Sequence, residues 1–197
     1  MESLFFLQSI FPTAAAPESL AMGFFILRSF GVSPKGEPRA TERASQQGSM
    51  ALKSSEFENN EMIPKKYTCE GDDVNPPLEI LNVPSEAASL ALIVHDGDAP
   101  TVGGWTHWIV FNIDPRISRL DADSVPEGAI EGETSFGVSG WGGPCPPSGT
   151  HHYEFRLYGL DSHLALGQQA KKADIEHAME GHIIGQSTLI GLYRKEK

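Results

Sequence analysis

Residues 137–161 read GVSGWGGPCPPSGTHHYEFRLYGLD, a loop rich in glycine and proline that runs directly into an alternating apolar segment. Glycine lets another group approach the backbone closely, and successive backbone N–H groups in such loops bind anions. The loop ends in His151 and His152, and apolar side chains then alternate from Tyr153 to Leu160, as in a β-strand. The stretch therefore predicts a β protein with an oxyanion pocket at the rim of a sheet.

Strand-like patterns continue on both sides of this stretch. Residues 89–95 (SLALIVH) form a continuous apolar run that ends at the turn-forming residues 96–100 (DGDAP). Residues 107–113 (HWIVFNI) carry apolar groups on both faces, which predicts a strand in the middle of a sheet that is covered on both sides. We expect further strands at residues 153–160 and 187–193, and weaker β patterns lie at residues 62–68 and 78–81.

One segment near the C-terminus has a clear helical pattern. Ile175, Ala178 and Met179 form an apolar stripe at i, i+3 and i+4. We expect Asp174 to N-cap this helix and Gly181 to end it in the left-handed conformation. Because strands come first and a single helix precedes the last strand, the order is not an alternating βαβ series. The pattern predicts a mostly β, antiparallel sandwich with a peripheral helix.

The charge distribution limits the kinds of partner. The chain of 197 residues has 15 basic and 26 acidic residues, which gives a formal net charge of −11. Residues 1–49 carry four residues of each sign, so the whole excess lies in residues 50–197. An acidic surface repels phosphate backbones and anionic headgroups at long range. Nucleic acid is therefore not expected as a partner, and any anion must be held by a local site.

The first 49 residues differ from the rest of the chain. Two apolar runs, at residues 4–11 and 20–27, fall short of the roughly 20 residues that span a bilayer, so stable membrane insertion is not expected. Three alanines at residues 14–16 resemble a signal-peptide cleavage site, but the preceding segment contains Glu2 and no basic residue. We expect residues 1–49 to be a disordered or non-native extension and residues 50–197 to be the folded domain. The expected location is cytoplasmic, with export as the alternative.

Four polar side chains are expected near the ends of the predicted strands. Asp96 and Asp98 follow the first strand two positions apart, so they point to the same side if the extended geometry persists. His107 opens the next strand, and His151 ends the glycine-proline loop. Histidines and loop N–H groups donate hydrogen bonds to phosphate, and a carboxylate beside them can orient a histidine. The four residues predict a phosphate-binding site at one rim of the sheet.

Each of these features also has a purely structural interpretation. An Asp pair at a strand end commonly stabilises a turn, and His107 can be a satisfied histidine at the edge of the core. Trp105 can pack at the rim of the core or wall a pocket. The prediction therefore depends on the order and spacing of the residues in combination.

Two other functional classes stay open at this point. In a metal-dependent phosphoester hydrolase, Asp96, Asp98, His107 and His151 would ligate a divalent metal, although the sequence has no closely spaced metal-binding motif. A Cys145 nucleophile activated by His151 lacks an identifiable orienting acid. A protein-interaction module would use the same pocket for a phosphorylated partner, so the sequence does not separate it from a small-ligand binder.

Two motifs resemble the phosphatidylethanolamine-binding protein family, specifically its prokaryotic Raf-kinase-inhibitor-like branch. The family's first motif is Asp-Pro-Asp-x-Pro followed by a histidine on the next strand, and here it reads DGDAP at residues 96–100 with His107. The second is a Gly-x-Pro-Pro-x-Gly-type loop running into His-Arg-Tyr, and here it reads GPCPPSGTHHY at residues 143–153. Residues 67–78 also resemble the start of the family's domain. The resemblance covers about residues 52–195.

The resemblance implies a Greek-key β-sandwich with one or two peripheral helices and a non-catalytic pocket without a cofactor. The implied partner is a small anion, such as phosphate or a phosphoethanolamine-like headgroup, or a phosphorylated protein or kinase that the chain modulates. A homodimer is a further expectation. The implied ligand-binding residues are Asp96, Trp105, His107, Gly143, Pro146, His151 and Tyr153, and the implied supporting residues are Asp98, Pro100 and His152.

The sequence departs from the family motifs at two positions. Gly97 replaces the proline of the first motif, which makes the turn less rigid. His152 replaces the arginine of the second motif and loses a permanent charge and a bidentate fork. If that arginine normally pairs with the second aspartate, here Asp98, the pairing becomes weaker and pH-dependent. We therefore expect ligand binding to weaken more steeply with rising pH than in relatives that carry arginine.

The two cysteines, Cys69 and Cys145, allow two states. They can form a disulfide, or both can be reduced thiols in a cytosolic protein. Because Cys145 lies on the predicted pocket loop, a disulfide would stiffen the site.

Overall fold

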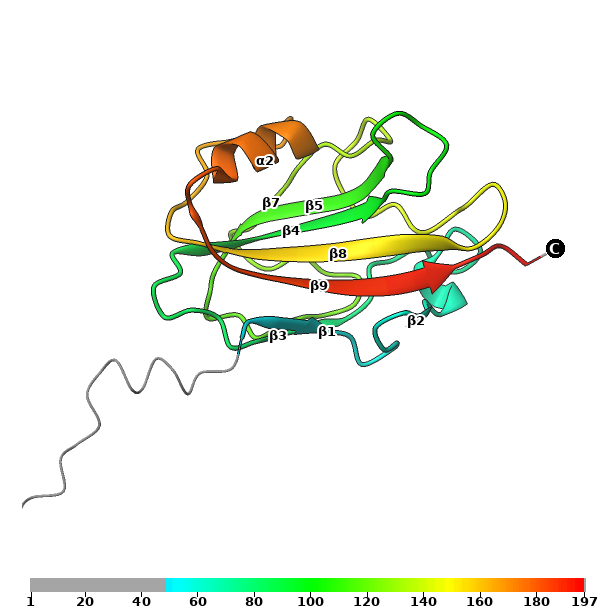
Figure 1. Ribbon diagram of the computed structural model, residues 1–197, viewed down its shortest axis with the longest axis horizontal. Coiled ribbons are helices and arrows are strands. Elements are labelled where there is room, and N and C mark those ends of the chain that lie inside the picture. Colours follow the sequence, from blue (N-terminus) through cyan, green and yellow to red (C-terminus); the bar gives the residue numbers. More distant parts are fainter. Residues whose placement is uncertain (1–48, 197) are drawn as a thin grey trace, which may run out of the picture. The chain divides into compact units, whose positions relative to one another are not determined.

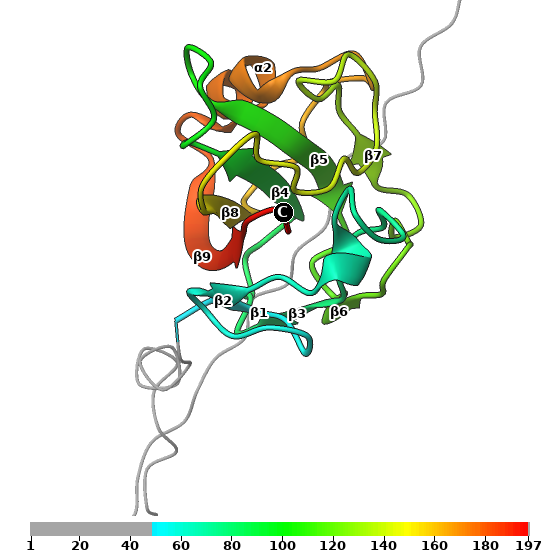
Figure 2. The ribbon, with the colours of Figure 1, turned by 90° about the vertical axis from the view of Figure 1, so that its right-hand side faces the viewer.

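The computed structural model describes residues 49–196, and two β-sheets pack face to face in this part of the chain (Figures 1 and 2). The larger sheet has the strand order β2-β9-β8-β4-β5-β7 and the smaller one β1-β3-β6, so the chain crosses repeatedly between the sheets. The predicted mostly β sandwich with a single α-helix is confirmed. The strands are β1 Ala51–Lys53, β2 Glu61–Met62, β3 Leu78–Leu81, β4 Ser89–Asp96, β5 Trp105–Ile113, β6 Arg119–Leu120, β7 Ile130–Glu131, β8 His151–Leu160 and β9 Ile183–Tyr193, and the helices are the 3₁₀ helix η1 Lys65–Tyr67 and α2 Lys172–Met179.

The central strand β4 explains why both faces of the large sheet are apolar. It pairs antiparallel with β5 on one side and with β8 on the other, and all of its residues are buried. Side chains of a strand alternate between the faces of the sheet. Leu92 and Val94 belong to the core between the two sheets, whereas Ala91 and Ile93 belong to a second core that includes Ile175 of α2. The expectation of a strand covered on both sides also holds for β5, which is buried almost throughout.

Three expectations about the elements need correction. The last strand begins at Ile183 rather than at residue 187, and β2 pairs parallel to β9 in an otherwise antiparallel pair of sheets. The β pattern at residues 62–68 is wrong beyond Met62. Pro64 follows with φ −58°, lacks an N–H for strand pairing, and introduces the 3₁₀ helix η1.

The expected N-cap of the helix was also wrong. Helix α2 begins at Lys172 with Lys171 as its N-cap, and the Asp174 carboxylate accepts a hydrogen bond from the Lys171 N–H at 2.9 Å. Asp174 therefore stabilises the helix start from the third helical position, as in a capping box. Gly181 has φ +79°, the left-handed conformation predicted for the end of the helix. In residues 49–196, no helix is long and apolar enough to cross a bilayer.

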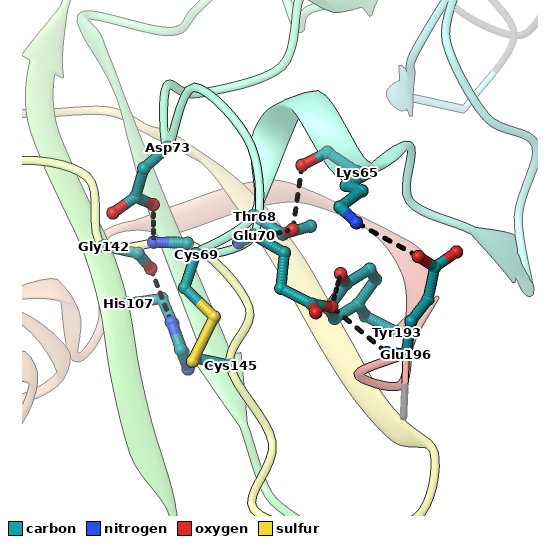
Figure 3. The surroundings of a disulfide bond; sticks show 11 residues. Lys65, Thr68, Cys69, Glu70, Asp73, His107, Gly142, Cys145, Tyr193 and Glu196 are labelled. Atoms are coloured by element: carbon teal, nitrogen blue, oxygen red, sulfur yellow. Dashed lines mark hydrogen bonds and ion pairs between the residues drawn. A yellow bond between two sulfur atoms is a disulfide. The ribbon is translucent and has the colours of Figure 1, made fainter.

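A disulfide joins the loop after η1 to the glycine-proline loop before β8 (Figure 3). Cys69 is bonded to Cys145, with their Cα atoms 5.5 Å apart. Two hydrogen bonds reinforce this contact, from the Cys69 N–H to the Pro144 carbonyl at 3.2 Å and from the Gly143 N–H to the Asp73 carboxylate at 2.7 Å. Disulfides persist in oxidising compartments, and the sequence left both a cytoplasmic and an exported location open. The location itself stays a prediction.

The loop after η1 is also tied to the end of β9 (Figure 3). The Tyr193 hydroxyl donates a short hydrogen bond to the Glu70 carboxylate, which also accepts the Glu196 N–H at 3.2 Å. Lys65 forms an ion pair with Glu196 at 3.0 Å. The loop carrying Cys69 is therefore fixed on one side to the last strand and on the other to the glycine-proline loop.

The core assignment predicts a large loss of stability from Leu92→Ala. Leu92 is 1% exposed, and removing such a side chain should lower the free energy of unfolding by about 2–5 kcal/mol through lost burial and a cavity. Leu81→Ala is the control, because Leu81 is 38% exposed and its truncation should cost about 1 kcal/mol or less. Urea denaturation followed by tryptophan fluorescence measures both. Equal losses would contradict this core.

The disulfide predicts a second stability difference. The bridge closes a sequence separation of 76 and should contribute about 2–4 kcal/mol to the free energy of unfolding. A Cys69→Ser, Cys145→Ser double variant should lose that amount in urea denaturation. In the parent protein, iodoacetamide should add no mass in urea without reductant and two adducts after reduction. Adducts without reductant would show that the cysteines are free thiols.

Candidate anion-binding site

Asp96 occupies the centre of the candidate site because of the strand register. It is the last residue of β4, and the register places it directly opposite Trp105 of β5 and Tyr153 of β8. Its carboxylate is almost fully buried, at 3% residue exposure, and each oxygen has hydrogen-bond donors. Oδ1 accepts the N–H groups of Asp98 at 2.9 Å and Ala99 at 3.1 Å, and Oδ2 accepts the Nδ1–H of His151 at 2.7 Å. The carboxylate thus fixes both the turn after β4 and the His151 ring.

A cavity of about 220 Å³ lies at this end of the sheet. It is enclosed by the turn after β4, the first residues of β5 and β8, the glycine-proline loop and one aromatic residue of the loop after β7. Six of the seven predicted ligand-binding residues and the predicted supporting residue Pro100 line it together. The lining residues are Asp96, Ala99, Pro100, Thr101, Trp105, His107, Phe136, Cys145, Pro146, Pro147, His151 and Tyr153.

His107 is held in the wall as a neutral imidazole. Its Nδ1–H donates to the Gly142 carbonyl at 2.6 Å, because a carbonyl oxygen can only accept (Figure 3). Burial lowers the pKa of His107 below its usual value, and this effect outweighs the hydrogen bond to Gly142 and the nearby Asp96 charge. In the neutral form, Nε2 is an acceptor, so His107 donates a hydrogen bond from Nε2 to an anion only after it takes up a proton.

Tyr153 brings a buried hydroxyl without a partner to the same cavity. Its side chain is fully buried, and in residues 49–196 its Oη is one of two buried side-chain polar atoms without a hydrogen bond. The backbone of Cys145 lies near it but outside hydrogen-bonding geometry. Burial, followed by the Asp96 charge, raises the pKa of Tyr153, so the hydroxyl keeps its proton. A buried unsatisfied donor on a cavity wall is suited to binding an acceptor from a ligand.

Three of the predicted residues lie outside the cavity. Gly143 lies beside the disulfide, where its N–H bonds to Asp73 and an added Cβ would come within 2.3 Å of the Asp73 carboxylate. Asp98 and His152 form the expected pair, with His152 Nδ1 and the His152 N–H 2.7 Å and 2.9 Å from Asp98 Oδ2. The hydrogen bond from the His152 side chain lowers the pKa of Asp98. Both side chains are about half exposed, so this pair holds the turn after β4 against β8 from outside.

The four side chains that would ligate a metal in the alternative hydrolase do not lie together. Asp96, His107 and His151 reach the cavity, but the Asp98 carboxylate is paired with His152 outside it. The described residues contain no group of three or more His, Cys, Asp or Glu side chains placed to hold one metal ion. The Asp96 oxygens are already used by two backbone N–H groups and by His151.

Phe136 is the main wall residue that the sequence did not reveal. Its ring packs edge-on against Trp105, with ring centroids 5.3 Å apart, and against His107 at 5.6 Å. It lies in a loop without strand or helix periodicity, and only the contact with β5 shows its role. Ala99, Thr101 and Pro147 were also missed, although they lie next to or between residues of the two motifs.

A larger hollow of about 730 Å³ lies at the other end of β4. It is lined by residues that precede β4 and follow β5, including Asp114, Arg116 and His163. Asp114 and Arg116 pair with each other, and the Arg116 guanidinium lowers the pKa of Asp114 to about 2. None of the residues of the two sequence motifs lines this hollow, and its Asp114 and Arg116 side chains satisfy each other, so we place the site at the smaller cavity.

Comparisons with known proteins identify relatives over the domain that carries the cavity. A family model described as phosphatidylethanolamine-binding protein matches residues 53–194. A UPF0098 protein of Methanothermobacter thermautotrophicus is 49% identical over 151 residues, which cover 74% of this chain and 99% of that protein. The solved structure of CT736 from Chlamydia trachomatis, a putative phosphatidylethanolamine-binding protein homologue, is 41% identical with a TM-score of 0.72, and the match covers 75% of this chain and 99% of that one. The structure of YbcL from E. coli is 29% identical with a TM-score of 0.72, and the match covers 76% and 100% of the two chains.

The family model spans most of the chain, and the relatives match over almost their entire length. The cavity is built from the two motifs by which the sequence resembles the same family. The chain belongs to the phosphatidylethanolamine-binding protein family.

Proposed function

We propose that the protein binds a phosphate-type anion in the cavity beside Asp96, as a non-catalytic member of the Raf-kinase-inhibitor-like branch of its family. The observation that carries this proposal is the buried, unpartnered hydroxyl of Tyr153 on the wall of a cavity that two histidines also line. A phosphate oxygen supplies the acceptor that this hydroxyl lacks. The bound phosphate belongs to a small headgroup-like ligand or to a phosphorylated side chain of a protein partner such as a kinase.

The residues of the cavity have separate roles in this binding. Tyr153 donates its hydroxyl proton to the anion without a change of charge. His107 takes up a proton and then donates from Nε2, while its Nδ1–H stays on the Gly142 carbonyl. Asp96 holds the proton of His151 on Nδ1 and so fixes the ring orientation and the tautomer. Trp105 and Phe136 cover one side of the cavity with aromatic rings and exclude water from the anion.

The use of the two carboxylates supports binding without catalysis. A general base must have an oxygen free to take a proton from water or from the substrate. The oxygens of Asp96 accept two backbone N–H groups and the His151 Nδ1–H, and Asp98 is bonded to His152. Both carboxylates therefore stabilise the turn after β4 and its contacts with β8.

Isothermal titration of the full chain with phosphoethanolamine tests this proposal. Tyr153→Phe removes only the hydroxyl and should weaken binding at least about tenfold, the usual effect of losing a hydrogen bond to a charged group. Tyr158→Phe is the matched control, because Tyr158 lies on the same strand but is only partly buried and packs against the second core on the α2 side. Equal binding by Tyr153→Phe and the parent would place the anion elsewhere. An absence of binding to the parent would contradict the proposed function.

The neutral state of His107 predicts that anion binding strengthens as the pH falls. Burial lowers the pKa of His107 in the free protein, and a bound anion favours the protonated ring, so binding is accompanied by proton uptake. Sulfate is the probe, because its own charge is constant in this range. Its affinity should rise from pH 7.5 to pH 5.5, by up to about tenfold per pH unit for one proton.

Two variants separate the histidines in this experiment. His107→Asn keeps a donor for the Gly142 carbonyl but cannot be protonated, and it should flatten the pH profile. His152→Arg replaces the histidine that pairs with Asp98 by a permanent charge and should flatten the profile only partly. A His107→Asn profile as steep as that of the parent would show that His107 does not take up the proton.

A further inference from the structure

A second hollow of about 330 Å³ adjoins the anion cavity. The two share Phe136 and Cys145 as a common wall, so a ligand that passes the edge of this wall reaches both. The remaining lining of the second hollow is formed by the loop that precedes Cys145 and by the loop after η1. These lining residues are Cys69, Asp73, Thr134, Val138, Gly140, Trp141, Gly142 and Gly143.

The two unsatisfied buried side-chain atoms of residues 49–196 belong to residues that line the two hollows. One is Oη of Tyr153, which lines the anion cavity, and the other is Nε1 of Trp141, which lines the second hollow. The Trp141 ring is fixed, since it packs edge-on against Trp108 at 5.7 Å and stacks on Phe155 at 6.1 Å. Buried polar groups are nearly always hydrogen-bonded, so each exception needs an explanation. Two unpaired donors on residues that line adjoining hollows have a common explanation if one ligand supplies both acceptors.

The rim of the second hollow is apolar. Phe136 and Val138 are 47% and 62% exposed, although both are large hydrophobic residues. The Phe136 ring lies against the backbone of Gly142, where an added Cβ would come within 2.3 Å of it. The loop that presents both side chains is closed by hydrogen bonds from the N–H and the hydroxyl of Thr134 to the Val138 carbonyl, at 3.0 Å and 2.8 Å. The exposed apolar groups are therefore held in place at the mouth of the hollow.

The charge in the second hollow excludes a second anionic group. Asp73 is among its lining residues, and its carboxylate accepts the Gly143 N–H at 2.7 Å. A negative group would be repelled there, and no lysine or arginine lines the hollow. The group that fits is neutral and apolar, with one hydrogen-bond acceptor for the Trp141 N–H.

We propose that the second hollow binds the organic part of the ligand whose phosphate occupies the anion cavity. This inference rests on the proposed function and names the class of ligand for the same site. The ligand is an organic phosphate monoester with a short apolar group that carries a carbonyl oxygen. The phosphate accepts hydrogen bonds from Tyr153 and His107, the apolar group covers Val138 and Phe136, and the carbonyl accepts the Trp141 N–H.

Titration with two monoesters of equal charge tests the apolar part of this proposal. Hexyl phosphate should bind the full chain about tenfold more tightly than ethyl phosphate, because its four extra methylenes are partly buried. Val138→Asn should remove most of this advantage and leave the affinity for ethyl phosphate within about twofold of the parent. Val102→Asn is the matched control. Val102 is fully exposed on the loop that carries Pro100 and Thr101, and it lines neither hollow, so the advantage of hexyl phosphate should persist.

The same titrations distinguish failure of this inference from failure of the proposed function. If both esters bind equally, or if Val138→Asn leaves the advantage intact, the second hollow does not bind the organic part, while anion binding still stands. If neither ester binds, the anion site itself is refuted and this inference with it.

The proposed hydrogen bond from the Trp141 N–H to the ligand carbonyl can be measured separately by NMR. The chain has three tryptophans, and the indole N–H cross-peak of Trp141 in a ¹H–¹⁵N spectrum is the one that Trp141→Phe removes. Saturating 5-oxohexyl phosphate, which adds a ketone to the hexyl chain, should shift this cross-peak downfield, and ethyl phosphate should leave it in place. A cross-peak that does not move with the ketone would overturn the role of Trp141.

Discussion

Burial of the Asp96 carboxylate is the constraint on which the rest of the site depends. A buried carboxylate must be hydrogen-bonded, since water no longer solvates its charge. Asp96 meets this requirement with the N–H groups of Asp98 and Ala99 and with the Nδ1–H of His151. These contacts bring the turn after β4 and the start of β8 together at the edge of the sheet. The cavity lies between these segments, and the Asp96 carboxylate holds them on both sides of it.

The opposite wall of the cavity is held by a different kind of bond. The glycine-proline loop has little periodic structure of its own, and it is fixed by the Cys69–Cys145 disulfide and by the Gly143 N–H on Asp73. The loop after η1 is in turn attached to the end of β9 through Glu70 and Tyr193. Substantial movement of the cavity wall therefore requires a break in a covalent bond or in several hydrogen bonds. Such a wall keeps the shape of the cavity before a ligand arrives, which reduces the entropy lost on binding.

Short-range patterns in the sequence predicted the elements well and the contacts between distant loops poorly. Strands β4, β5 and β8 were recognisable because their apolar periodicity is local, and the motif residues Asp96, His107 and His151 meet in one cavity. Phe136 was missed because its role depends on packing against β5, which no local pattern encodes. For the same reason, the motif residue Gly143 was wrongly expected in the cavity. Its N–H instead donates a hydrogen bond to the Asp73 carboxylate beside the disulfide.

The cavity holds no cationic side chain that would offset the negative charge of the whole protein. With a net charge of −11, the chain repels anions at long range, and no lysine or arginine lines the cavity. The donors available there are a tyrosine hydroxyl and histidines, one of which is held neutral by burial. Such groups recognise an anion by hydrogen-bond geometry at short range rather than by attraction at a distance. Under the proposed function, selection among anions depends on how well the rest of the ligand fits the apolar surface beside the donors, because every phosphate monoester presents the same oxygens to them.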